Sequence, residues 1–300
     1  MSEHIRNIVA WFYAYYLLKS GRLKKVFKKS DNNKIILSVY FHNPSRKLFE
    51  KSVLFFLQRN FNFISTNQLA EIFEKKLEFP VRSVLFTVDD GWKENQTNII
   101  EIAEKYQIPV TIFLTADPIE KGESYWWSIA IKAIKGKLLP YSLSQMKELS
   151  NNDRISIIEE LKKKIPTVRE AFTIEQIKSH KQSKFVTFGA HTITHPILTK
   201  CEDQVSQSEI SQSAQIIQSW VNYPVTHFAY PNGNYTEREI AYLKVSGYQS
   251  AFTTHPKYIT KESIEKPFEI PRFDVLENVT FAENICRMTG IWFERKNKTN

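Results

Sequence analysis

The chain has 300 residues, 42% of them hydrophobic and 24% charged, a balance that excludes an intrinsically disordered chain. Two cysteines, Cys201 and Cys286, are too few for a disulfide framework or a cysteine-rich zinc module. The net charge of +9 is concentrated in residues 1–30, where seven basic residues oppose one acid and leave only +3 for the rest. We therefore expect no nucleic-acid partner, because such binding needs a basic face on the folded domain.

Residues 1–30 are predicted to form a basic, aromatic helical arm. The apolar stretch 8–18 is too short to cross a bilayer, and its basic residues follow it rather than precede it. We expect no signal peptide, no transmembrane helix and a cytoplasmic protein. An aromatic helix beside Lys and Arg suits an anionic membrane surface. Two hypotheses stay open: residues 5–29 attach the protein to the inner membrane face, or the aromatic side chains pack on the domain.

Strands and helices alternate along residues 31–290, the predicted main domain, which favours βα units and parallel strands. Residues 118–184 interrupt this alternation with a Lys-rich, mostly helical insertion, and residues 291–300 form a polar tail. A helix is expected through 68–75, with Thr66 as its N-cap. The expected strands are 35–41, 63–65, 83–88, 110–114, 185–188 and 226–230, and the other expected helices are 47–58, 95–106, 202–220 and 237–246.

The first candidate site follows the strand 83–88, where Asp89, Asp90 and Gly91 stand in a row. Neighbours in a strand point to opposite faces, so both carboxylates serve one site only where the strand breaks, which Gly91 permits. Adjacent carboxylates repel, and a nearby cation relieves that repulsion. The alternative is a polar strand end with an ordinary turn.

The second candidate site is the pair His191 and His195, which directly follows the strand 185–188. Two histidines four residues apart lie on one side of a helical turn and suit a single metal ion. Pro196 is incompatible with the long helix of zinc peptidases, so that class is disfavoured. Two hydrogen-bonded loop histidines are the alternative. With Asp90 they make an open three-ligand set that leaves a position for water.

A third motif is the tight turn 230–233, which follows the strand 226–230. In this order the three motifs resemble the polysaccharide deacetylases of the NodB-homology, carbohydrate esterase 4 type. The opening strand that ends at His42 and the late Pro271-Arg272 support the resemblance, which covers about residues 35–275. It implies a distorted (β/α) barrel of about seven strands. A dehalogenase-type phosphatase is a poor fit, because Gly91 stands where that class needs a second Asp.

The resemblance implies a metal-dependent hydrolase that removes N-acetyl or O-acetyl groups from a polysaccharide or oligosaccharide. Asp89 would be the general base. One divalent ion, expected to be zinc, would be held by Asp90, His191 and His195. Surface-glycan biosynthesis would fit an enzyme at the inner membrane face.

Other residues are assigned to the substrate by the same resemblance. The backbone N–H of Asn232 would help form the oxyanion hole, with Tyr230 and Pro231 in the same turn. Trp92 would stack on a sugar face, although a core role is as plausible for it. These four residues are the predicted substrate and oxyanion contacts.

Two departures from the family pattern keep an alternative open. Ala229 stands where the family often has an Arg that pairs with the base, and Arg272 is the expected replacement. The usual C-terminal Leu-x-His motif is not evident, so His255 is the nearest candidate general acid. The alternative function is a non-catalytic glycan-binding module on a degenerate barrel.

Overall fold

The structure is a computed structural model that describes residues 3–294. Eight strands form one sheet in the order β7-β6-β5-β4-β3-β1-β8, and every strand pairing among them is parallel. The short strand β2 pairs with the first half of β3, and β4 pairs with its second half. The strands are β1 (Leu37–Phe41), β2 (Asn62–Ile64), β3 (Ser83–Val88), β4 (Val110–Leu114), β5 (Val186–Ala190), β6 (His227–Ala229), β7 (Ser250–Phe252) and β8 (Phe273–Asp274).

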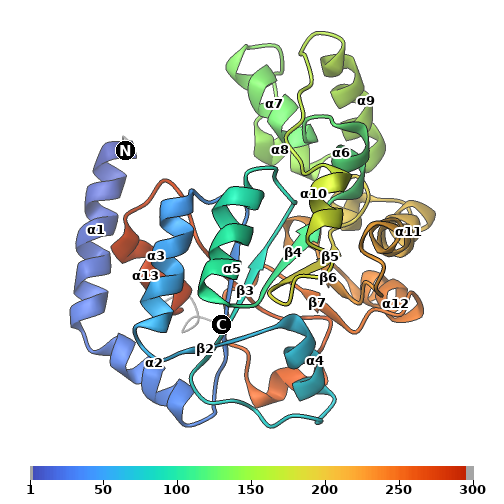
Figure 1. The fold of residues 1–300 in the computed structure, drawn as a ribbon. Helices are drawn as coiled ribbons and strands as arrows, with labels where there is room; N and C mark the ends of the chain where they lie inside the picture. The colour runs from blue at the N-terminus through green and yellow to red at the C-terminus, as the bar shows by residue number, and fades with distance from the viewer. Residues whose placement is uncertain (1–2, 295–300) are drawn as a thin grey trace.

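Helices surround this sheet and also form the insertion (Figure 1). The α-helices are α1 (Glu3–Lys19), α2 (Arg22–Asp31), α3 (Arg46–Leu57), α4 (Thr66–Phe73), α5 (Glu101–Tyr106), α6 (Ala116–Lys121), α7 (Trp126–Lys135), α8 (Leu143–Glu148), α9 (Asn151–Lys162), α10 (Ile174–Ser179), α11 (Asp203–Val221), α12 (Glu237–Val245) and α13 (Phe281–Met288). Shorter turns are a π-helical turn η1 (Gln96–Ile100) and the 3₁₀ turns η2 (Leu198–Lys200), η3 (Pro231–Gly233) and η4 (Lys261–Glu265).

Two local expectations need correction. The hydroxyl of Ser65, not that of Thr66, caps α4: it accepts from the Gln68 N–H at 3.0 Å. The Gln68 side chain in turn accepts from the Ser65 N–H at 2.9 Å, which completes a capping box. The helix predicted over 95–106 begins as the π-helical turn η1 and becomes α-helical only at Glu101.

The two edges of the sheet are linked by one stretch of chain. Ile270 bridges Phe252 of β7 in parallel, and three residues later the same chain forms β8, which pairs with β1. The sheet therefore curls round as a distorted (β/α) barrel, as the sequence predicted. Arg272 lies within this linking stretch, completely buried.

Alternating strand residues separate two packed regions. Leu85, Phe113, Phe252 and Ile270 belong to a cluster inside the barrel, whereas alternate residues such as Phe86 pack beneath the outer helices. This two-sided burial explains why the strands are nearly continuous apolar runs in the sequence.

The predicted insertion is helical and has a small core of its own. That core includes Ile129 of α7, Met146 of α8 and Ile158 of α9, all buried. Figure 1 shows α7, α8 and α9 grouped together at one end of the sheet. A self-packed unit of this kind can present side chains to the barrel without rearranging the strands.

The N-terminal arm forms α1 and α2, and α1 lies beside α13 (Figure 1). Its inner face contains the buried Ala14 and Leu17, and Tyr13 packs its ring against Trp292 at 5.2 Å. Of the predicted tail 291–300, the structure describes 291–294, and Ile291 is buried in the core. Within 3–294 there is no helix with both the length and the apolarity needed to span a bilayer.

Candidate metal centre and active site

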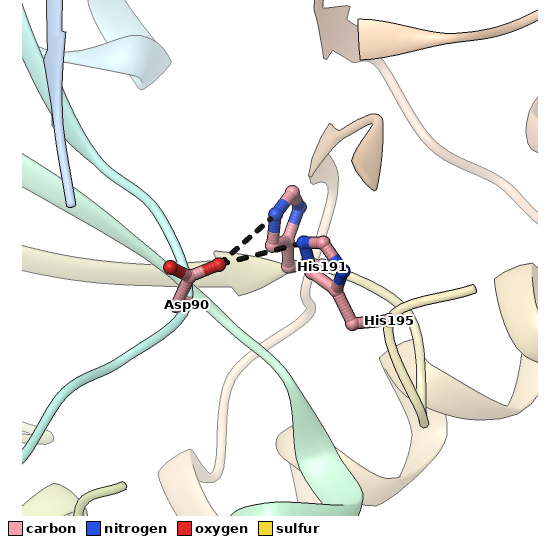
Figure 2. Close-up of side chains that lie close together, drawn as sticks. All are labelled: Asp90, His191 and His195. Carbon is pink, nitrogen blue, oxygen red and sulfur yellow. Dashed lines mark ion pairs between the residues drawn. The ribbon is translucent and has the colours of Figure 1, made fainter. Parts of the chain in front are cut away.

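The three predicted metal ligands converge at the carboxyl ends of β3 and β5. Asp90, His191 and His195 are all buried, and one ligand atom from each lies within 4.8 Å of the other two. The Oδ1 atom of Asp90 is 3.6 Å from Nε2 of His191 and 3.5 Å from Nε2 of His195 (Figure 2). Residues about 100 positions apart in the sequence thus face one point, at the edge where parallel sheets place their sites.

The strand breaks at Asp90 itself, one residue before the expected position. Asp90 has φ of +76°, and Gly91 follows with φ of +82°. A Cβ on Gly91 would lie 2.7 Å from the Leu114 side chain, so this turn requires glycine. The break separates the carboxylates: Asp89 turns into the barrel interior, while Asp90 turns toward the histidines and accepts from Trp92 Nε1 through Oδ2 at 2.9 Å.

The histidine segment is an irregular loop rather than the helical turn that the spacing suggested. Thr192 has φ of +67° and His195 has φ of +57°, and this tight path brings the two imidazole rings to 4.7 Å. Glu209 of α11 holds the loop by accepting from the backbone N–H groups of Ile193 at 2.7 Å and Thr194 at 2.9 Å. Sequence analysis missed Glu209, which stands in an ordinary helical pattern.

The donor set fits a divalent metal ion. Oδ1 of Asp90 is buried and has no hydrogen-bond partner among the described residues, a costly state that a bound cation relieves. Nδ1 of His191 donates to the Ala229 carbonyl at 2.7 Å, which leaves Nε2 free to ligate. Ligand atoms that share a tetrahedral zinc at about 2.0–2.1 Å lie about 3.3–3.5 Å apart, close to the spacing found here. Burial also lowers the pKa of His191 and His195, which favours the neutral, ligating imidazole.

Arg272 forms a buried ion pair with Asp89, the pairing that the sequence analysis expected of it. Its Nη1 and Nη2 donate to the two Asp89 oxygens at 2.7 and 2.8 Å. Its Nε donates to the Thr253 carbonyl at 2.9 Å, which fixes the guanidinium in the barrel interior. Burial, the largest influence, raises the pKa of Asp89, but the charge and hydrogen bonds of Arg272, together with His191 and His42, hold that pKa below its ordinary value.

A cavity of about 140 Å³ opens onto the ligands and both carboxylates. Sequence analysis gave no site role to two of its polar residues, His42 and Lys147. His42 directly follows β1 at the same sheet edge, so the strand pattern contained a signal for it. Lys147 comes from α8, and its Nζ donates to the Asn232 side chain at 2.6 Å. The lining residues are His42, Asp89, Asp90, Trp126, Trp127, Leu143, Lys147, His191, His195, Ile197, Asn232 and Thr254.

The other predicted substrate residues lie elsewhere. Tyr230 is completely buried, and its hydroxyl donates to the Phe268 carbonyl at 3.0 Å. Pro231 is buried in the same turn, and Trp92 lies behind Asp90 rather than in the cavity lining. His255 lines a separate, larger cavity of about 560 Å³. Of the turn, only Asn232 faces the cavity of the metal ligands.

The fold and the site define the class of protein: an α/β barrel with a buried carboxylate and two buried imidazoles, a candidate metal site, at the carboxyl edge of its parallel strands. Residues 76–251 match the polysaccharide deacetylase family, and the chain belongs to that family.

Individual relatives agree with this assignment. The chain is 23% identical over 175 residues to "Putative polysaccharide deacetylase YxkH" of Bacillus subtilis (strain 168), covering 58% of this chain and 46% of YxkH. The chain thus spans about half the length of this curated relative.

Two solved structures share the fold. The deacetylase PplD of Streptococcus pyogenes, solved in complex with acetate, aligns with a TM-score of 0.62 and 18% identity over 85% of this chain and 98% of PplD. IcaB of Ammonifex degensii aligns with a TM-score of 0.62 and 16% identity over 86% of this chain and 97% of IcaB.

Proposed function

We propose that the protein is a metal-dependent deacetylase that hydrolyses the N-acetyl group of a sugar unit in a glycan. The observation that carries the proposal is the buried, unpartnered Asp90 Oδ1 facing two imidazole nitrogens inside a deacetylase-family barrel. A divalent ion bound there, with zinc as our candidate, supplies Lewis-acid chemistry: it polarises an acyl oxygen and lowers the pKa of a water molecule.

The protein's own residues supply the remaining chemistry. Asp89 lies at the cavity, ionised by its pair with Arg272, and accepts the proton of the attacking water as general base. Because both Asp89 oxygens are held by the Arg272 fork, the carboxylate keeps one orientation through the reaction. We further propose that the backbone N–H of Asn232, at the cavity wall, stabilises the oxyanion.

The leaving amine also needs a proton donor. We propose His42 for this role, since it lines the cavity and is not one of the three ligands. The sequence analysis named His255 as the candidate general acid, but His255 lines a different cavity from the one that contains Asp89 and Asp90. His42 is exposed, so it contacts solvent as well as the cavity.

The glycan-binding module is the weaker alternative. Sugar binding alone does not require the groups found here. They are a buried carboxylate kept ionised by a buried arginine, with a second carboxylate and two imidazoles beside it. The test is acetate release from N-acetylated oligosaccharides, free and lipid-linked, by the wild-type protein and Asp89→Asn.

We expect acetate from the wild-type protein and loss of at least about 100-fold in turnover for Asp89→Asn, with bound metal retained. Ser38→Ala, in the barrel but absent from the cavity lining, is the control and should keep its turnover. No acetate from any substrate, with metal bound, would favour the binding module.

We also propose that the arm attaches this enzyme to an anionic membrane surface. The outward face of α1 exposes large apolar side chains, among them Val9 at 55%, Phe12 at 61% and Tyr16 at 56%. A helix that is apolar on both faces needs cover on both, and α13 covers only the inner one. The apolar residues on the exposed face are Ile5, Ile8, Val9, Trp11, Phe12, Tyr15 and Tyr16.

The positive charge of the neighbouring helix indicates what covers the exposed face of α1. The adjoining α2 exposes Lys24, Lys25, Lys28 and Lys29. These cations favour an anionic lipid surface and oppose docking of a second, equally basic copy.

Sedimentation with vesicles of phosphatidylglycerol and phosphatidylcholine tests the attachment. Wild-type protein should sediment, and Phe12→Ser/Tyr16→Ser should stay in solution. Leu138→Ser, which removes an equally exposed apolar side chain from the insertion, serves as the matched control. Equal sedimentation of the double variant would refute the attachment, as would an α1-dependent dimer without vesicle binding.

A further inference from the structure

Three consecutive insertion residues contact two of the metal ligands. The Tyr125 hydroxyl donates to the backbone carbonyl of Asp90 at 3.0 Å. Trp126 Nε1 donates to the backbone carbonyl of His195 at 2.9 Å. The Trp127 ring packs on the His195 imidazole, with ring centroids 4.3 Å apart. The segment 125–127 therefore fixes ligands from two different strand ends at once.

The later part of the insertion also contacts the loop that follows Asp90. The Phe172 N–H donates to the Gly91 carbonyl at 3.0 Å, and the Lys93 N–H donates to the Glu170 carbonyl at 2.9 Å. The Glu170 carboxylate also accepts from the Tyr125 N–H at 3.1 Å, which ties the two ends of the insertion together. The insertion is thus joined to the loop after Asp90 by its own backbone.

The ligand backbones need such support. Asp90 and His195 both have left-handed φ angles, +76° and +57°, which cost energy in residues with side chains and persist where surrounding contacts hold them. Trp126 is itself held: the buried Arg154 of α9 lies over its ring, 5.0 Å from the centroid. A chain of contacts therefore leads from the insertion core to the His195 carbonyl.

We propose that segment 125–127 is a brace that sets the metal affinity of the site, with Tyr125 and Trp126 as positioning residues. The inference rests on the proposed function, since it concerns the same ligands. Polar contacts behind metal ligands typically contribute about 10- to 100-fold to metal affinity. The insertion is then part of the metal centre, because Tyr125 and Trp126 hold the backbones of two of the ligands.

The test is the dissociation constant for Zn²⁺, measured by competition with a chromophoric chelator. Trp126→Phe keeps an aromatic ring and loses the N–H donor. Tyr125→Phe removes only the hydroxyl oxygen, so it is the second test variant if Trp126→Phe does not fold. Trp220→Phe is the matched control, because Trp220 is a buried tryptophan near the carboxyl end of α11 and is absent from the cavity lining. The absorption bands of the Co²⁺-loaded proteins report the ligand geometry directly.

We expect each brace variant to bind Zn²⁺ about 10-fold more weakly or worse and to shift the Co²⁺ bands, with Trp220→Phe unchanged. Wild-type affinity and spectra in both folded brace variants would overturn the brace and leave the proposed function standing. Failure of the wild-type protein itself to bind Zn²⁺ would overturn the proposed function, and the brace with it.

Discussion

Removing the Arg272 side chain tests the buried ion pair at the centre of the barrel. Both partners are buried, at 0% and 3% side-chain exposure, and two charge-assisted hydrogen bonds of 2.7 and 2.8 Å join them. Arg272→Met leaves the Asp89 carboxylate buried and uncompensated, which costs about 3–5 kcal/mol of unfolding free energy. Arg46→Met is the control, because its ion pair with Glu101 is about half exposed, at 46% and 48% side-chain exposure, and its loss should cost about 1 kcal/mol or less.

A double-mutant cycle separates this pair from simple loss of packing. Urea unfolding at pH 7 of Arg272→Met, Asp89→Leu and the double variant gives the coupling energy between the two side chains. The double variant removes both charges, so it should be more stable than the sum of the single losses predicts, by about 3 kcal/mol. Additive losses, or a loss below about 1 kcal/mol for Arg272→Met, would refute the reasoning.

Two further predictions concern the strands behind the site. His227 is buried between the Ser250 hydroxyl and the Asn67 amide oxygen, and burial lowers its pKa to about 4. The folded protein favours the neutral imidazole, so His227 stabilises the fold fully above about pH 6.5, and up to about 3 kcal/mol of unfolding free energy is lost as the pH falls toward 4. His227→Gln should weaken this pH dependence of the unfolding free energy. An unchanged pH dependence in the variant would contradict the assignment. Gly189→Ala places a Cβ 2.6 Å from the Phe113 ring and 2.9 Å from the His227 carbonyl, so it should cost about 1–3 kcal/mol in urea unfolding, and wild-type stability would contradict that packing.

The sequence was most informative where burial acts on both faces of an element. The run 83–88 became β3 with the predicted bounds, because a covered parallel strand tolerates little besides apolar and β-branched residues. The sequence pointed to Asp90, His191 and His195 as candidate ligands because they stand within five residues of such a strand end, and parallel strands end at one edge.

Contacts between distant segments were harder to predict. No local pattern marks Lys147 as a cavity residue, since its position depends on how α8 of the insertion packs. The loop path through Thr192 and His195 was also missed, because positive φ values in residues with side chains depend on tertiary contacts such as Glu209. His255 follows β7 by three residues, yet the chain turns it toward another cavity.

Elemental analysis of the purified protein tests the central claim most directly. The wild-type chain should hold about one divalent ion, and His191→Ala should hold almost none while its circular dichroism stays unchanged. His180→Ala, which removes a histidine bonded to Gln96 and Glu104 instead, should keep the ion. Equal metal content in His191→Ala and the wild-type protein would contradict the claim that Asp90, His191 and His195 share one ion.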